Sequence, residues 1–171
     1  MTRRKASTPP TAARLRVPGV AFLLSQLGYY SSRRWKARLA PLDLDPRHVM
    51  VLRRLAGDEG RSQQALGDAL QIPPSRMVAL VDVLEQRGLL MRRPSPSDRR
   101  VRTLHLTKEG RRLLGEIMEI SLEHEQQLCR GLQPAEREQL LTLLNRLAAE
   151  QGLAEGIHPG AGDPDPDERF R

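Results

Sequence analysis

The sequence is poor in aromatic residues and nearly free of cysteine. Only 3% of its 171 residues are Phe, Trp or Tyr, and Cys129 is the single cysteine. A hydrophobic core must therefore be built mainly from Leu, Val and Ala, and no disulfide within the chain can stabilise it. Because disulfide-free chains are typical of reducing compartments, we expect a cytoplasmic protein.

Long hydrophobic runs are also missing. No stretch of the sequence approaches the roughly 20 apolar residues that a membrane-spanning helix needs. The basic start of the chain carries no apolar segment of the kind that precedes a signal-peptide cleavage site. We therefore expect neither a membrane protein nor a secreted one.

The residue patterns of metal sites and enzyme active sites are absent as well. Four histidines, at positions 48, 105, 124 and 158, are scattered without the cysteine or carboxylate spacing of a zinc site. The sequence has no phosphate-binding loop and no glycine-rich dinucleotide motif. Cys129 has only Arg130 as a cationic neighbour in sequence, so it is not expected to sense oxidants. We expect no metal, no cofactor and no catalytic activity.

Positive charge is what the sequence has in excess. Lys and Arg outnumber Asp and Glu by 28 to 21, which gives a net charge of +7 and a pI near 10.6. This excess favours a polyanionic partner, and double-stranded DNA is the strongest candidate.

The charge is concentrated in residues 89–107, LLMRRPSPSDRRVRTLHLT. Two apolar runs, Leu89–Met91 and Val101–Leu106, flank a turn rich in proline and serine, which predicts a β-hairpin. Asp98 is the only acid in it, whereas five arginines lie in or near the turn: Arg92, Arg93, Arg99, Arg100 and Arg102. A hairpin tip this cationic suits phosphate oxygens better than burial.

The rest of the chain predicts helices. Apolar residues at three- and four-residue steps predict six of them, over residues 20–39, about 46–57, 63–70, 75–87, 108–132 and 134–150. Asp45, Ser62 and Thr107 are expected N-caps, and Gly88 is an expected helix stop. The expected inward residues of the second and last helices are Val49, Leu52, Leu55, Ala56, Leu140, Leu141, Leu143, Leu144 and Leu147.

The order of these elements predicts a mainly α protein with a small β-hairpin. We expect a winged helix-turn-helix DNA-binding region over residues 45–106. The N- and C-terminal helices, residues 17–44 and 107–150, are unusually apolar and are expected to form a dimerisation lobe. Residues 1–16 and 151–171 are expected to be disordered. The first of these segments is either a plain tail or a basic arm that reaches DNA.

Residues 18 to about 150 resemble the MarR family of bacterial transcriptional regulators. The similar segments are LAPLDLDPRHVMVLRRLA and SQQALGDALQIPPSRMVALVDVLEQRGLLMRRPSPSDRRVRTLHLTKEG. The most specific parts are LEQRGLL, the triplet Asp98-Arg99-Arg100, and LTKEG. The resemblance implies a homodimer on a palindromic operator, more often a repressor than an activator, and often released by a small-molecule effector.

A winged-helix dimer would place helix 75–87 in the major groove, which is wide enough for an α-helix. Ser75 and Arg76 are best placed to reach base edges, and Val78 could contact a thymine methyl group. Ala79 is a further candidate contact, although the family often has an arginine there. Two alternatives stay open, in which Ser75 only caps its helix and Arg76 is an ordinary surface residue.

The resemblance also assigns roles to the hairpin, which would be the wing. It places Arg100 in the minor groove, where a bidentate bond from Asp98 would hold its guanidinium. Arg93, Arg99 and Arg102 are expected to bind phosphates, which positions the protein without reading sequence. The alternative is that these arginines form an ordinary solvated charge run.

An effector pocket is expected between the first two helices and helix 108–132. Its expected lining is Tyr30, Arg34, Trp35, Arg38, His48 and Val49. A tryptophan beside arginines suits a small aromatic or carboxylated effector, although Trp35 could equally be plain core. A different class of function also stays open, that of an architectural protein that binds DNA without sequence preference.

Overall fold

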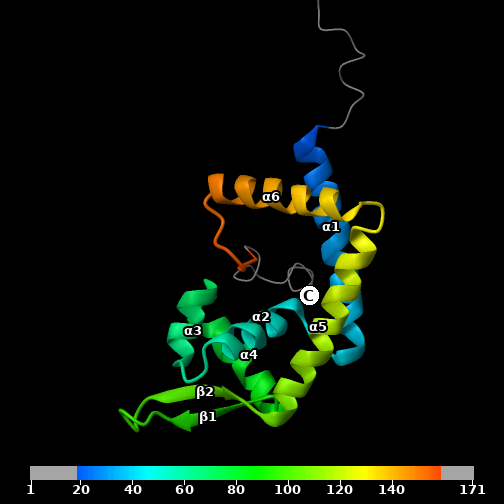
Figure 1. Cartoon of the computed structure of the whole chain (residues 1–171). Coiled ribbons are helices and arrows are strands. Elements are labelled where there is room, and N and C mark those ends of the chain that lie inside the picture. The colour runs from blue at the N-terminus through cyan, green and yellow to red at the C-terminus, as the bar shows by residue number, and fades with distance from the viewer. Residues whose placement is uncertain (1–18, 159–171) are drawn as a thin grey trace, which may run out of the picture.

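The computed structural model describes residues 19–158, which form helices and one small antiparallel sheet (Figure 1). The elements are α1 Val20–Leu39, the 3-10 helix η2 Ala40–Leu42, α2 Pro46–Gly57, α3 Gln63–Leu70, α4 Pro74–Gln86, β1 Leu90–Pro94, β2 Arg102–Leu106, α5 Lys108–Leu128 and α6 Pro134–Glu150. The predicted fold class, mainly α with a small hairpin, is confirmed. Within this part of the chain, no helix is both long and apolar enough to cross a bilayer.

Both terminal segments fall largely beyond this range. The expected basic arm, residues 1–16, lies outside the described residues, and so does most of the expected tail. Residues 151–158 continue from α6 as turns, in which the Leu153 amide donates to the Ala148 carbonyl at 3.0 Å.

The helices begin at the capping side chains that the sequence predicts. The Asp45 carboxylate accepts a hydrogen bond from the Arg47 amide at 2.8 Å, and Nδ1 of His48 accepts one from the Asp45 amide at 3.1 Å. Before α5, the Thr107 hydroxyl accepts a hydrogen bond from the Gly110 amide at 2.9 Å. Each bond satisfies an amide that has no partner within its helix, which is why these residues fix the helix starts.

One core joins the end of α1 with α2, α3, α4, the hairpin and the first half of α5. Its largest fully buried side chains are Leu39, Leu52, Leu55, Leu66, Met77, Leu84, Leu90, Leu104, Ile117, Val51 and Val81. The expectation that Ala56 faces inward is wrong, because Ala56 is exposed and Val51 is buried instead. The inward face of α2 is therefore rotated from the one predicted.

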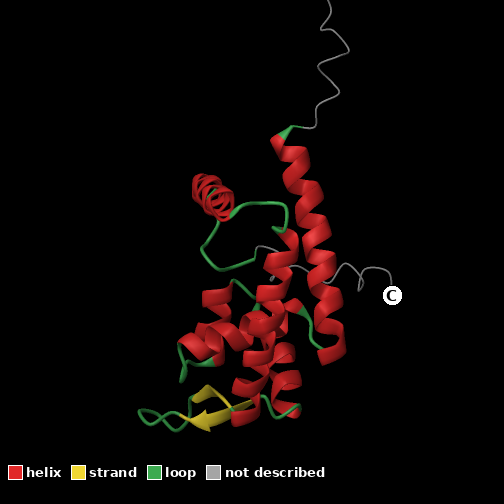
Figure 2. Ribbon diagram, turned by 45° about the vertical axis from the view of Figure 1, so that its right-hand side comes forward, coloured by secondary structure: helices red, strands yellow, loops and turns green. Residues whose placement is uncertain are grey.

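The base of the hairpin packs into this core, and the tip of the hairpin projects away from it (Figures 1 and 2). Its register pairs Leu90 with Leu106 and Arg92 with Leu104, and all three leucines are buried. The first strand begins one residue later than predicted. The carbonyl of Leu89 is used elsewhere, since it accepts a hydrogen bond from the Thr107 amide at 3.1 Å at the start of α5.

The second half of α1 packs against α5. The rings of Trp35 and His124 lie 5.7 Å apart, and the Ser31 hydroxyl lies 3.0 Å from Nε2 of His124. Arg38 forms an ion pair with Glu123 at 3.2 Å. These contacts fix α1 to the long helix over its last two to three turns only.

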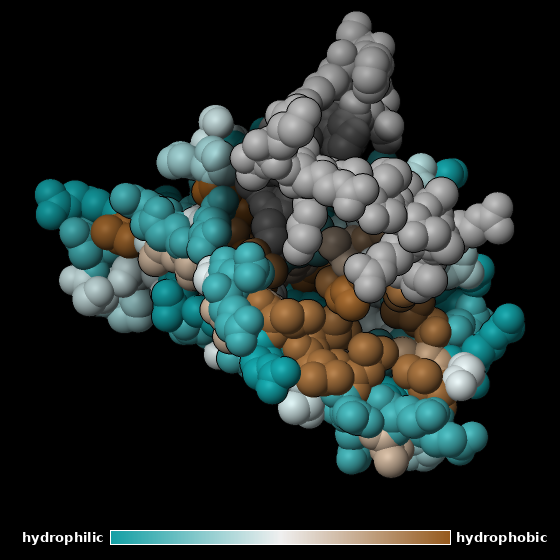
Figure 3. Space-filling view, turned by 90° about the horizontal axis from the view of Figure 1, so that it is seen from above, coloured by the Kyte–Doolittle hydropathy of each residue, from teal (hydrophilic) through white to brown (hydrophobic). Residues whose placement is uncertain are grey.

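The first half of α1 and the whole of α6 leave their apolar side chains exposed. The prediction that the leucines of α6 are buried is wrong for the single chain, in which Leu140, Leu141, Leu143, Leu144 and Leu147 are 36–59% exposed. Helix α6 lies apart from α2, α3 and α4 (Figures 1 and 2), so within the described residues these helices do not cover it. Hydrophobic surface accordingly gathers on the face seen from above (Figure 3).

Candidate nucleic-acid interface

The first turns of helix α4 present mostly uncharged side chains to the outside. Ser75 and Ala79 are exposed, Val78 is 43% exposed, and Arg76 is half-buried. The N-cap of α4 is Pro73, so the alternative in which Ser75 caps this helix is wrong. All four predicted groove residues thus lie in the first turns of one helix, with Ser75, Val78 and Ala79 open to a partner.

The predicted stripe of Met77, Leu80, Val81 and Leu84 fixes this orientation. These side chains are at most 7% exposed and hold the inner side of α4 against the core. The opposite side must therefore face outward, because residues three and four apart share one side of a helix.

The tip of the hairpin is shaped by hydrogen bonds between its own residues. The Ser95 amide donates to the Val101 carbonyl at 2.8 Å, and the Val101 amide donates to the Asp98 carbonyl at 2.9 Å. Ser95 is buried beneath the loop, where its hydroxyl lies 2.9 Å from that of Ser97. The loop between the strands is thus closed by its own backbone and presents its arginines outward.

The predicted bidentate pair between Asp98 and Arg100 is present. Nε of Arg100 lies 3.2 Å from Oδ1 of Asp98, Nη2 lies 3.3 Å from Oδ2, and the Arg100 amide donates to Oδ1 at 3.0 Å. These hydrogen bonds lower the pKa of the Asp98 carboxyl, so it remains ionised. The Arg100 side chain is nevertheless 91% exposed, which leaves its remaining donors free for another molecule.

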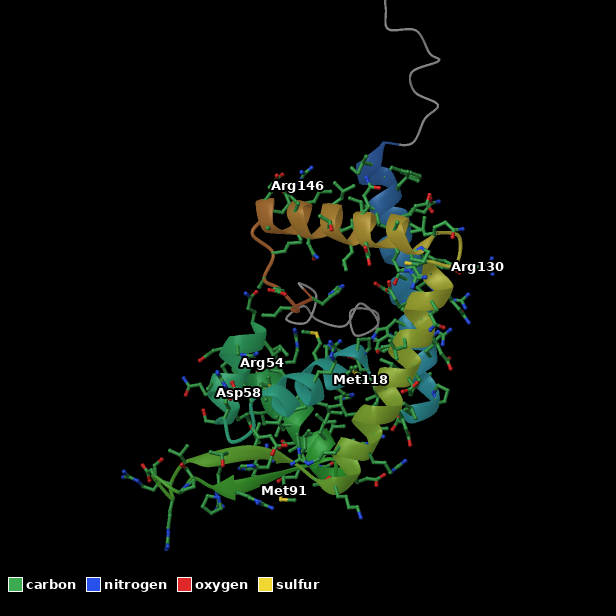
Figure 4. All side chains as sticks on the ribbon, in the orientation of Figure 1. Arg54, Asp58, Met91, Met118, Arg130 and Arg146 are labelled. Atoms are coloured by element: carbon green, nitrogen blue, oxygen red, sulfur yellow. The ribbon has the colours of Figure 1, made fainter. Side chains whose placement is uncertain are left out.

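Arg93, Arg99 and Arg102 are exposed around the same tip. Within residues 19–158, none of the three lies within ion-pair distance of a carboxylate. Figure 4 shows nitrogen-bearing side chains projecting away from the body at this end of the molecule, beyond the strand marked by Met91. The hairpin therefore ends in a cluster of positive charge without compensating acids apart from Asp98.

Arg92 differs from the other four arginines, and grouping it with them was wrong. Its Nη2 donates to Asp82 at 2.6 Å and to Gln63 at 3.0 Å, and its Nη1 pairs with Glu85. The Arg92 amide also donates to Glu85, at 3.0 Å. Arg92 thus binds the base of the hairpin to α4 and α3 instead of pointing to solvent.

These contacts of Arg92 also affect the charge of the residues involved. Burial opposes the charged form of Arg92, but the hydrogen bonds that Arg92 donates to Asp82 and Glu85 outweigh this effect and raise its pKa. The sequence carried a signal for this arrangement, because alternate residues of a strand share a face. Arg92 follows buried Leu90 by two positions and so lies on the inner face, where it needs acidic partners.

A second contact ties the hairpin to α5. Glu59 binds Arg111 through two hydrogen bonds, at 2.5 and 3.0 Å, and accepts a bond from the Leu106 amide at 3.4 Å. The contact with Arg111 lowers the pKa of the Glu59 carboxyl. The end of β2, the start of α5 and the loop before α3 are therefore held together.

The predicted effector residues do not share one pocket. Tyr30 and Arg34 line a cavity of about 400 Å³ together with Leu27, His124, Gln127, Leu128, Arg130 and Gly131. Nη2 of Arg34 donates to the Gln127 side chain at 2.9 Å, and its Nη1 donates to the Tyr30 hydroxyl at 3.1 Å. The cavity lies between α1 and the end of α5, farther from α2 than predicted.

The remaining four predicted lining residues make contacts outside this cavity. Val49 is 3% exposed in the core, and His48 caps α2. Trp35 packs against His124 and the core, as its alternative interpretation had it, and Arg38 is paired with Glu123. Within the described residues, no group of three His, Cys, Asp or Glu side chains could hold a metal ion.

Cys129 lies just after α5 and is 8% exposed. Burial raises the pKa of its thiol, and the nearby Glu125 adds to that rise. A raised pKa lowers the thiolate fraction, so this environment does not favour a reactive cysteine.

Comparison with known proteins places these features in a family. The sequence profile of the MarR family matches residues 42–101. A candidate transcriptional regulatory protein for the hcr operon of Thauera aromatica is 38% identical over 97 residues, which cover 57% of this chain and 58% of that protein. The chain thus matches little more than half the length of this relative.

Solved structures match over a greater length. The transcriptional repressor CouR bound to a 23-mer DNA duplex is 31% identical, with a TM-score of 0.68, and the match covers 83% of this chain and 99% of that one. CouR from Rhodococcus jostii RHA1 bound to p-coumaroyl-CoA is 32% identical, with a TM-score of 0.62, covering 75% of this chain and 91% of that one.

Proposed function

The chain belongs to the MarR family of transcriptional regulators, and from this premise we propose that it is a cytoplasmic homodimer that binds a palindromic DNA operator and represses transcription. Helix α4 enters the major groove through Ser75, Arg76, Val78 and Ala79. The hairpin is the wing, with Arg100 in the minor groove and Arg93, Arg99 and Arg102 on phosphates.

The observation that carries this proposal is the Asp98–Arg100 pair at the hairpin tip. The carboxylate holds the guanidinium through two hydrogen bonds, while the Arg100 side chain stays 91% exposed. A cationic group that is both oriented and open suits a narrow A·T-rich minor groove, where negative potential is concentrated. CouR, a relative of similar fold, was solved with a DNA duplex.

The homodimer rests on the exposed apolar surface of α1, α5 and α6. Its largest exposed members are Val20, Phe22, Leu27, Tyr29, Tyr30, Met118, Leu122 and Leu141, which range from 46% to 68% exposed. Monomeric soluble proteins rarely leave so much contiguous apolar surface open to water. A second copy of the chain would cover it and, by twofold symmetry, would present two α4 helices to successive major grooves.

A small effector would release the protein from DNA. The cavity beside Tyr30 and Arg34 combines aromatic and cationic walls, which suit an aromatic ligand with an anionic group. CouR was solved with such a compound, p-coumaroyl-CoA.

Selection of bound sequences from random DNA duplexes tests the function. We expect an inverted repeat with half-sites about one helical turn apart, roughly 10 base pairs. The Arg100→Ala variant should bind that site about tenfold more weakly and lose preference at its A·T flanks, a loss typical of one specific contact.

Arg54→Ala is the matched control, because Arg54 is exposed in the last turn of α2 and belongs to neither the hairpin nor α4. An architectural protein would instead yield no preferred sequence, and its binding would fall uniformly with salt. That outcome would overturn the regulator proposal.

A further inference from the structure

The exposed side of α4 is unusually apolar for a helix that would face DNA. Beyond Ser75, its exposed positions include Val78 and Val83, which are 43% and 39% exposed, and Ala79 between them. None of these three side chains can donate or accept a hydrogen bond. Three exposed side chains of α4 therefore end in methyl groups, beside the exposed polar side chains of Ser75 and Gln86.

The two acids of α4 do not alter this conclusion. Asp82 and Glu85 are both held by the guanidinium of Arg92 from the base of the hairpin. The single positive charge of Arg92 offsets one of their two negative charges, and their bonded oxygens are turned toward the hairpin. Helix α4 then offers the floor of a groove the apolar surface of Val78, Ala79 and Val83, next to the polar side chains at positions 75, 76 and 86.

Only one chemical group on that floor matches such a surface. In the major groove, the C5-methyl of thymine is the apolar group, whereas guanine, adenine and cytosine present hydrogen-bonding atoms there. A valine set against those atoms would leave them without water or a partner, which carries a free-energy cost. Against a thymine methyl group, the same valine buries apolar surface on both sides.

Resting on the proposed DNA-binding function, we propose that contacts of Val78, Ala79 and Val83 with thymine methyl groups contribute to the selection of the operator by α4. Val78 and Val83 are five residues apart, which is about 7.5 Å along a helix that rises about 1.5 Å per residue. Base pairs are spaced by about 3.4 Å, so the two valines contact methyl groups of different base pairs.

Replacing thymine by deoxyuridine in the operator tests the proposal directly, because this change removes the methyl group and nothing else. The full-length protein is titrated against the selected operator and against duplexes in which single thymines are replaced. We expect at least two positions in each half-site at which the change weakens binding about fourfold, the loss for one buried group of this size.

Variants then assign each methyl group to a side chain. In Val78→Ala, the penalty for deoxyuridine at one position should fall from about fourfold to nearly none, while the penalty at the other position persists. Val83→Ala should show the reverse pattern. Both valines are largely exposed, so the variants should fold, which circular dichroism checks.

Val101→Ala is the matched control, because Val101 is exposed to the same degree, 41%, but lies in the hairpin loop. A change in the overall affinity of this variant is compatible with the proposal. The loss of affinity caused by each deoxyuridine should be the same as in the parent protein. A merely structural role of the α4 valines would likewise lower affinity without shifting the penalties.

The outcomes separate this inference from the function on which it rests. A selected inverted repeat whose thymines can all be replaced at no cost would overturn the inference alone. So would penalties that persist unchanged in both valine variants. Failure to select any preferred sequence would overturn the regulator proposal, and the thymine contacts with it.

Discussion

Two parts of this molecule carry the same kind of leucine-rich pattern but have different surroundings. From α2 to the first half of α5, Leu52, Leu66 and Leu84 are wholly buried. In the first half of α1 and in α6, Tyr29 is 68% and Leu141 59% exposed. The first part, which we call the closed part, forms its core from one chain. The second, the open part, has its apolar side chains in place but nothing within the described residues to cover them.

The difference shows what an apolar stripe does and does not specify. An apolar stripe indicates which side of a helix is buried away from water. It does not indicate whether the surface that buries it belongs to the same chain or to another one. Substitutions in the closed part should therefore change the free energy of unfolding of the single chain. Substitutions in the open part should change association.

The largest effect is expected in the closed part, at Gly110. A Cβ atom at this position would meet the carbonyl oxygen of Leu89 far inside van der Waals distance. Because that oxygen is backbone, it cannot move aside without displacing β1 from α5. Gly110→Ala should lower the free energy of unfolding by about 3 kcal/mol, the upper end for overpacking, as measured by urea denaturation.

Gly115 supplies the control on the same helix. A Cβ there would meet nothing within 4 Å, so Gly115→Ala should raise stability by up to about 1 kcal/mol through helix propensity. Equal effects of the two substitutions would show that α5 and the strand do not approach as closely as described.

The open part is tested next, at Leu141 on α6. Leu141→Glu places a charge on the exposed apolar surface. This substitution should weaken the free energy of dimerisation by about 2 kcal/mol for each substituted side chain, a value typical of a strong interface residue. Sedimentation equilibrium should then show monomers at concentrations where the parent chain is dimeric. Operator affinity should fall along with the loss of the dimer.

Leu141→Met is the matched control, since it keeps an apolar side chain of similar size and should remain dimeric. A parent chain that sediments as a monomer would contradict the distinction between the two parts. It would mean that the apolar surface of α6 is covered by something other than a second copy.

A smaller effect is expected at the base of the hairpin, where Arg92 joins the wing to the closed part. Arg92→Ala leaves Asp82 and Glu85 uncompensated on the helix that would face DNA phosphates. Affinity should fall about tenfold, most strongly at low salt, where charge repulsion is least screened. Gel-shift titrations at two salt concentrations measure this.

The triple variant Arg92→Ala, Asp82→Asn, Glu85→Gln separates charge from position. If repulsion by the two carboxylates causes the loss, removing their charge should restore most of the affinity. If the triple variant binds as weakly as the single one, the role of Arg92 is instead to hold the hairpin at its angle to α4.

Local patterns were enough to predict most of the fold. The caps at Asp45 and Thr107 and the stripe of Met77 to Leu84 depend on neighbouring residues, and the structure has them as predicted. The end of α5 was predicted too late, at residue 132. The chain turns after Leu128 because the Leu132 amide donates to the Cys129 carbonyl at 2.9 Å instead of continuing the helix.

The features that could not be predicted from the sequence depend on contacts between residues far apart in the chain. Strand alternation indicates that Arg92 lies on the inner face, but only the folded structure shows that its partners are Asp82 and Glu85. The expected effector residues lie on the first two helices, which were expected to enclose a pocket together with the long helix. The side chains of Val49 and His48 are nevertheless committed to the core and to a helix cap. The groove and wing residues stay predictions, since their position on the surface does not by itself establish contact with DNA.

The smallest expected effect is a pH dependence that belongs to the closed part. Burial lowers the pKa of His48 below its usual value of 6.5; nearby Asp45 opposes the shift, and Arg87 and Arg47 add to it. The unfolded chain therefore binds the proton more readily than the folded one. The contribution of neutral His48 to stability should be complete above pH 6.5 and should be lost as the pH falls through the lower folded value.

His48→Gln isolates this contribution. Glutamine at the third position of a helix can accept the same hydrogen bond from the Asp45 amide, so the cap of α2 is kept while the titrating group is removed. Because burial also lowers the pKa of His124, the parent chain should lose stability on acidification at two sites. The difference between parent and variant in urea denaturation at pH 7.5 and 5.5, roughly one pH unit either side of an ordinary histidine pKa, belongs to His48 alone. A variant that loses as much stability as the parent between these pH values would show that His48 already accepts a proton in the folded protein as readily as in the unfolded chain.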